Sequence, residues 1–169
     1  MKKYVKIGLV YAAIVLVALV SLYIVSVRDF EGVYIGMGKA DFEECIPSES
    51  RYSYYAYCFY TNKWGNPVIV KFDYGTGTED PKVEDVRCFS RLGIRNSNRA
   101  FERLEKGMSI YEVVSKVGIP CGSHTYGMDS SAYQAKDGTV YTVYWWAEGV
   151  EVDSEFFVDS VVSMSGSGA

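Results

Sequence analysis

The chain has 169 residues, of which 15% are aromatic, and a formal net charge of −4 at pH 7. After residue 27, 14 basic side chains stand against 21 acidic ones without any run of Lys or Arg, which argues against nucleic acid or an anionic lipid surface as a partner. No G-x-x-x-x-G-K-[ST] string occurs, and nothing in the sequence indicates a nucleotide, a metal or another cofactor.

The first predicted element is an apolar helix. The 21 residues from Ile7 to Val27 carry no charge and follow three lysines, Lys2, Lys3 and Lys6. At about 1.5 Å per residue this helix is roughly 32 Å long, enough to cross a bilayer. The lysines place the N-terminus in the cytoplasm. We expect residues 1–27 to be a cytoplasmic stub and an uncleaved anchor of a single-pass membrane protein; a cleaved signal and a buried helix of a soluble protein are the alternatives.

The rest of the chain contains an internal repeat. The pattern F-E-x-[LV]-x-x-G-M occurs at Phe30–Met37 and, 71 positions later, at Phe101–Met108. An apolar segment, Val68–Phe72, has its counterpart 73 positions later in Tyr141–Trp145. Because a period near 70 is longer than that of solenoid repeats, we expect a duplicated small module.

The first copy, residues 28–90, is predicted to be degenerate. Its leading helix is expected to be the outer end of the membrane span, Arg28 to Tyr34, and its second helix to be Lys39 to Cys45. Runs rich in aromatic and β-branched residues then predict strands. These strands are expected over 51–61, 67–74 and 83–90.

The second copy, residues 91–162, has clearer signals. A helix is predicted over 99–106, and a second one begins at a capping box made by Ser109 and Glu112. Three strands are expected over 131–136, 139–147 and 150–157, and a disordered tail over 163–169. The predicted fold is α+β: an N-terminal transmembrane helix followed by two tandem helix-helix-antiparallel-meander modules, with the helices on one side of a largely antiparallel sheet.

The clearest local string is Gly107–Pro120, in which Gly-Met-Ser, Glu-Val-Val and Gly-Ile-Pro follow one another, with Asp-Gly downstream at Asp137. This string resembles the SmpA/OmlA (BamE-like) envelope domain superfamily, closely over Phe101–Phe157 and loosely over Phe30–Phe89. The tandem form is similar to the β-lactamase inhibitor proteins, which are built from two such modules. The resemblance implies an extracytoplasmic domain that binds proteins, either as a scaffold in envelope assembly or as an inhibitor that presents a concave sheet to an enzyme.

Strand alternation assigns the two faces of the predicted sheet. Positions that are apolar in both copies are taken as the face covered by helices: Val68, Val70 and Phe72 in the first copy and Tyr141, Val143 and Trp145 in the second. Within the strand predicted over 51–61, the same phase turns Tyr54, Cys58 and Tyr60 inward.

The opposite phase carries aromatic rings, which protein interfaces favour energetically. We therefore expect a protein-binding face made of Tyr55, Tyr57, Phe59, Tyr144 and Trp146. The alternative is that these rings reflect only the high strand propensity of aromatic residues.

Four cysteines lie in the part predicted to be outside the cell, where disulfides are permitted: Cys45, Cys58, Cys88 and Cys121. Their spacing lacks the close pairs of a zinc site. A disulfide between Cys45 and Cys58 is the favoured pairing because it closes the shortest loop, and the alternative is that all four are small buried side chains.

The remaining candidate chemistry is a thiol beside an imidazole. His124, the only histidine, follows Cys121 by three residues. A loop of that length points the two side chains apart, so we expect no enzyme. The predicted function is a membrane-anchored, extracytoplasmic, non-catalytic module that binds a protein in the cell envelope or outside the cell. The alternative is a sensor or carrier that holds a small ligand or peptide between sheet and helices.

Overall fold

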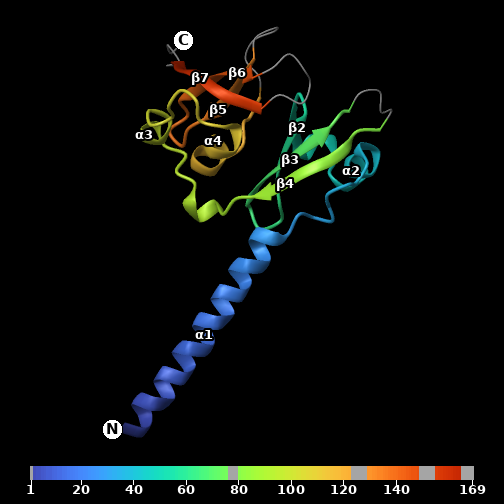
Figure 1. The fold of residues 1–169 in the computed structure, drawn as a ribbon. Helices are drawn as coiled ribbons and strands as arrows, with labels where there is room; N and C mark the ends of the chain where they lie inside the picture. The colour runs from blue at the N-terminus through green and yellow to red at the C-terminus, as the bar shows by residue number, and fades with distance from the viewer. Residues whose placement is uncertain (1, 76–79, 123–128, 149–154, 165–169) are drawn as a thin grey trace.

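The structure is a computed structural model, and it describes residues 2–75, 80–122, 129–148 and 155–164. Its first element, helix α1 (Lys2–Arg28), projects away from the rest of the chain (Figure 1). This helix is long and apolar enough to cross a membrane, and its most apolar stretch, Gly8–Arg28, has no buried residue. The predicted apolar helix is therefore confirmed, and the alternative of a helix buried in a soluble core is wrong.

The first sheet has four antiparallel strands in sequence order: β1 (Arg51–Tyr54), β2 (Tyr57–Thr61), β3 (Pro67–Asp73) and β4 (Lys82–Cys88). Helix α2 (Lys39–Cys45) and the turns before it lie on one face of this sheet, and the short 3₁₀ turn η1 (Ser48–Ser50) leads into β1. The residues buried under α2 include the three predicted for that face: Val68, Val70 and Phe72.

Two predicted elements of the first half are corrected. Helix α1 ends at Arg28, so no helix covers the predicted span Arg28 to Tyr34; turns lie there instead. The predicted strand over 51–61 is a hairpin, with Tyr55 and Ala56 as its turn. Tyr55 has a φ of 51°, a positive value of the kind that tight two-residue hairpin turns require.

The hairpin turn changes which way β1 faces. Tyr54 pairs with Tyr57 across the turn and shares its face, so Tyr54 is buried on the side opposite Cys58 and Tyr60. The prediction that Tyr54 points the same way as Cys58 and Tyr60 was wrong, because the two turn residues interrupt the alternation on which it rested.

The second sheet has three antiparallel strands: β5 (Ser130–Gln134), β6 (Val140–Glu148) and β7 (Glu155–Met164). Before them come the 3₁₀ turn η2 (Arg91–Gly93) and the helices α3 (Asn98–Phe101) and α4 (Ile110–Val117). Helix α3 is a single turn, shorter than predicted. Strand β7 runs from Glu155 to Met164 and so includes Ser163 and Met164, which the sequence assigned to a tail, while residues 150–154 of the predicted strand lie outside the described residues.

Helix α4 forms as its sequence predicts. The Ser109 side chain accepts a hydrogen bond from the Glu112 backbone N–H, and the Glu112 carboxylate accepts one from the Ser109 backbone N–H. The helix buries an apolar stripe against the second sheet, where the predicted inward residues are also buried: Tyr141, Val143 and Trp145.

The two sheets are separate, and helix α4 packs between them. Tyr111 of α4 contacts Tyr57 of the first sheet, with ring centroids 6.0 Å apart, and Tyr57 also contacts Phe156 of β7 at 6.0 Å. One continuous core therefore joins the second face of the first sheet to α4 and the second sheet. The prediction of a single sheet with helices on one side was wrong. The second face of β2 and β3 is also apolar, and the packing of α4 and the second sheet on it removes that face from water.

The two halves repeat the same backbone hydrogen bonds at the F-E-x-[LV]-x-x-G-M pattern. The Gly36 N–H donates to the Val83 carbonyl at 2.8 Å, and the Gly107 N–H donates to the Val158 carbonyl at 2.8 Å. Val83 and Val158 each donate back to the methionine that follows the glycine. Both glycines have φ near 90°, which a side chain would oppose, so the pattern forms the same brace between turn and last strand in both halves.

Candidate binding surface

The five residues of the predicted aromatic face do not lie on one surface. Tyr57 and Phe59 are 1% and 0% exposed. Strand β2 is covered by α2 on one side and by α4 and Phe156 on the other, so neither ring is available to a partner. Their assignment to an exposed face was wrong, because the second half of the chain packs on that face.

Tyr55 lies at the tip of the β1–β2 hairpin and is 58% exposed. Its hydroxyl donates a hydrogen bond to the Asp129 carboxylate at 2.7 Å, and its ring contacts those of Tyr54 and Phe156. The bond to Asp129 raises the pKa of Tyr55 because it favours the protonated phenol. Tyr55 therefore bridges the two halves at the surface, next to but not within the second sheet.

Tyr144 and Trp146 lie on the outer face of the second sheet, as predicted. The Trp146 ring is 39% exposed and stacks on the ring of Phe157, its neighbour on β7, with centroids 5.2 Å apart. Val162, further along β7, is 48% exposed. We call this surface the open face and define it by Tyr144, Trp146, Phe157, Ser160 and Val162.

The sequence prediction did not identify Phe157 and Val162 as parts of the open face. A β-bulge at Asp159 of β7, opposite Tyr144 and Trp145, shifts the pairing of β6 with β7 by one residue. Simple alternation along β7 therefore could not place both residues on one side. The rings predicted to be exposed on β6 were the available signal, because the strand that pairs with β6 must place side chains beside them.

The candidate disulfide does not form. All four cysteines are free: Cys45 and Cys121 are exposed, Cys88 is half-buried and Cys58 is buried. Burial raises the pKa of Cys58, and it raises that of Cys88 to about 11, so both thiols stay protonated at neutral pH. Cys45 points to solvent from the end of α2 while Cys58 lies under the same helix, which keeps the two apart.

The thiol and imidazole pair falls partly outside the described residues, since His124 lies there. The Cys121 thiol is 3.4 Å from the Ala132 carbonyl, to which it donates. Among the described residues, no group of three His, Cys, Asp or Glu side chains could hold a metal ion.

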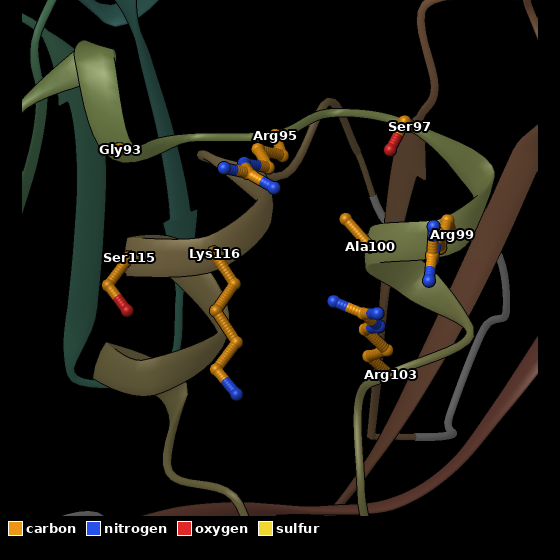
Figure 2. Close-up of a pocket in the computed structure, with 8 residues that line it drawn as sticks. All are labelled: Gly93, Arg95, Ser97, Arg99, Ala100, Arg103, Ser115 and Lys116. Atoms are coloured by element: carbon orange, nitrogen blue, oxygen red, sulfur yellow. The ribbon is translucent and has the colours of Figure 1, made fainter.

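A cleft of about 540 Å³ opens between α3 and α4, and its lining is basic rather than apolar (Figure 2). We call it the cationic cleft and define it by its lining residues: Gly93, Arg95, Ser97, Arg99, Ala100, Arg103, Ser115 and Lys116. It lies between two helices at the surface. It is therefore not the apolar pocket between sheet and helices that a sensor or carrier of apolar ligands would need.

The sequence prediction also missed this cleft. A signal was available, since Arg91, Arg95, Arg99 and Arg103 follow one another at intervals of four residues. These arginines are too widely spaced to form a basic run, and they do not show in the net charge because the chain has more acidic than basic residues.

No protein-family model matches this chain, and a comparison with curated proteins found no match. The resemblance to BamE-like domains therefore stays a prediction, and the function must be argued from the geometry of the open face and the cationic cleft.

Proposed function

We propose that this chain is a single-pass membrane protein whose external part consists of two tandem BamE-like modules and binds a protein of the envelope or the extracellular space without catalysis. The N-terminus lies in the cytoplasm, and the open face of the second module is the contact surface.

The membrane part of the proposal is supported by α1. An exposed apolar helix of this length has no favourable environment in water, because its side chains find no cover within the described chain. Lysines at its start favour insertion with that end in the cytoplasm.

The tandem part of the proposal is supported by the repeated brace. The glycine and valine pairs make the same hydrogen bonds in both halves. In each sheet the pairing of the last two strands also shifts by one residue, between Lys71 and Phe72 of β3 and between Tyr144 and Trp145 of β6. These two shifts are 73 positions apart, the offset of the apolar segments. Unrelated halves have no physical reason to share these details.

The observation that carries the binding proposal is the stacked pair Trp146 and Phe157 on the open face. Trp146 is 39% exposed near the end of β6, where it pairs with Phe157 of β7 beyond the last residue that pairs with β5. Rigid aromatic rings on a sheet offer large contact area at low cost in side-chain entropy, and such rings dominate the energy of many protein interfaces. Val162 extends the apolar area along β7.

The test uses the full-length protein in its own membrane. A photo-crosslinking amino acid placed at position 160, inside the open face, should capture one protein partner. Trp146→Ala and Phe157→Ala should each reduce the captured amount at least about tenfold, the effect of losing an interface anchor worth about 1.4 kcal/mol or more.

The matched control is Leu92→Ala. Leu92 is 81% exposed on η2, away from the second sheet, so its truncation should leave capture unchanged. Undiminished capture by both open-face variants, with normal amounts of folded protein in the membrane, would show that this face is not the contact surface.

A further inference from the structure

The cationic cleft brings four positive side chains from separate segments to one hollow. Arg95 precedes α3, Arg99 lies on α3, Arg103 follows it, and Lys116 comes from the last turn of α4. Figure 2 shows α4 and α3 as opposite walls, with Lys116 extending from one and Arg103 pointing into the space from the other. No acidic residue is among the lining residues.

These cations have no carboxylate partners in the described part of the chain. The ion pairs found there use other basic residues, such as Arg51, Lys71 and Arg87. The nearest acid along α4, Glu112, lies one turn before Lys116, and the charge of Lys116 helps to lower its pKa. Its carboxylate accepts hydrogen bonds from Ser109 and forms no ion pair with Lys116. Four positive side chains without an ion pair therefore line one cleft in a chain whose net charge is negative.

The walls of the cleft are held in place by their own hydrogen bonds. The Arg95 backbone N–H donates to the Lys116 carbonyl at 2.9 Å, which fixes the segment before α3 against the end of α4. The Asn96 side chain donates to the Gln134 carbonyl at 2.7 Å, and that of Asn98 donates to Asp137 at 2.7 Å. The charges therefore gather in a hollow whose backbone does not need to rearrange when a ligand binds.

We propose that the cationic cleft binds a phosphate group carried on a small organic moiety. Guanidinium groups match phosphate oxygens with two parallel hydrogen bonds, and Lys supplies an additional charge. A hollow of about 540 Å³ is larger than inorganic phosphate needs, so it has room for a glycerol-sized group beside the phosphate. The ligand class is a phosphate ester, either soluble or in a phospholipid headgroup.

A phospholipid source is within reach because the arginine series starts beside the end of α1. The Arg91 backbone N–H donates to the Asn66 side chain at 2.9 Å, and the Asn66 side chain donates to the Ser26 carbonyl in the last turns of α1 at 3.0 Å. Figure 1 shows η2 next to the upper end of this helix. Only the lipid source rests on the proposed membrane anchoring; phosphate binding itself does not, nor does it depend on the open face.

The test is titration of the full-length protein, in micelles of the phosphate-free detergent dodecyl maltoside, with sn-glycerol 3-phosphate. The double variant Arg103→Gln/Lys116→Gln should lose at least about tenfold in affinity, because both lost groups are charged donors. The control Lys82→Gln/Lys136→Gln removes the same charge at exposed sites outside the cleft and should lose less than about twofold. Circular dichroism checks that both variants are folded.

A second titration separates the two sources. Micelles with added phosphatidylglycerol are compared with micelles made equally anionic with oleate, which contains no phosphate. If titrated glycerol phosphate binds more weakly only in the micelles with phosphatidylglycerol, the lipid headgroup occupies the cleft. If both kinds of micelle give the same affinity, the ligand is soluble. Absence of binding to the wild type, or equal losses in the cleft variant and the control, would overturn the proposal.

Discussion

The outer faces of the two sheets differ in how far their apolar side chains are exposed to solvent. In the first sheet, Tyr57, Phe59 and Ile69 are buried against the second half of the chain. In the second sheet, Trp146 and Val162 remain exposed. The face away from the sheet's own helix is thus covered by the other half of the chain in the first sheet. In the second sheet it is buried around Ala132 and Thr142 but exposed at Trp146 and Val162.

The two sheets differ in which positions of their outer faces carry aromatic rings. The buried Tyr57 and Phe59 correspond, at the repeat offset of 73, to Ser130 and Ala132 of the second sheet. Conversely, the counterpart of the exposed Trp146 is Asp73, a charged residue at the end of β3. The outer-face rings therefore lie on β2 in the first sheet and on β6 and β7 in the second, and only those of β2 are buried against the other half.

The largest expected effect tests this comparison directly. Phe59→Ala should lower the free energy of unfolding by about 3–5 kcal/mol, because it removes a fully buried ring from the core shared by both halves. Trp146→Ala should lower it by much less, since its ring is already partly in water. Urea unfolding of the full-length protein in detergent, followed by circular dichroism, measures both.

Phe59→Leu serves as the control, because it keeps most of the apolar volume and should cost less than the alanine variant. If Phe59→Ala proved as mild as Trp146→Ala, the second face of the first sheet would not be buried, and the contrast between the sheets would be lost.

A smaller effect concerns how each half caps its second helix. Helix α4 has a local cap from Ser109, whereas the equivalent residue before α2 is Gly38, which has no side chain to offer. There the Asp80 carboxylate, from the segment before β4, accepts a hydrogen bond from the Lys39 backbone N–H at 2.9 Å. The first half thus replaces a local cap by one that forms only after the chain has folded.

Ser109→Ala should therefore destabilise the protein by about 1 kcal/mol, the usual cost of losing an N-cap. Asp80→Ala should also lower the melting temperature, and the two losses should add, because the caps lie in different halves. Ser48→Ala, at an exposed turn, is the neutral control. No change in melting temperature on Asp80→Ala would mean that α2 does not depend on the distant carboxylate.

The smallest expected effect is a pH dependence whose largest single contribution lies in the first half. The Lys63 side chain, the Trp64 ring N–H and the Glu31 backbone N–H hold the pKa of Asp29 at about 2, below its ordinary value of 3.8. Because the folded-state pKa is lowered, the Asp29 carboxylate stabilises the fold above about pH 4 and loses this contribution as the pH falls toward 2. Ala100, its counterpart in the second half, cannot titrate. The pKa values of Glu112 and Asp137 in the second half are also lowered by hydrogen bonds, but Asp29 has the larger shift.

Hydrogen exchange between pH 4 and pH 2 can localise this loss. After correction for the intrinsic exchange rates, protection should fall in β2 and β3 more than in β5 and β6, and Asp29→Asn should remove the difference. An equal loss in both sheets, or an unaltered difference in the variant, would contradict the assignment to Asp29.

The sequence was sufficient for features fixed by neighbouring residues. The span of α2, the capping box of α4 and the buried phase of β3 and β6 all follow from local propensity and alternation. The hairpin at Tyr55 and Ala56 could not be predicted in this way, because its turn contains neither Gly nor Asn nor Pro. One missed turn was enough to reverse the face assigned to Tyr54.

Features that depend on contacts between distant parts of the chain cannot be predicted from local sequence patterns. Whether the rings of Tyr57 and Phe59 meet water depends on where α4 docks, and alternation along one strand contains no information about that. The cationic cleft likewise needs α3 and α4 to lie against each other before Arg103 and Lys116 can face a common space.

The junction between α1 and the first sheet carries a mechanical consequence. The side chains of Asn62 and Asn66 both donate to the Ser26 carbonyl at 3.0 Å, and the Trp64 ring N–H donates to Asp29 at 2.9 Å. These hydrogen bonds join α1 rigidly to the first sheet. A tilt or rotation of α1 must therefore turn the folded part of the chain with it. The orientation of the stacked rings of Trp146 and Phe157 would then be set by how the opposite end of α1 is held.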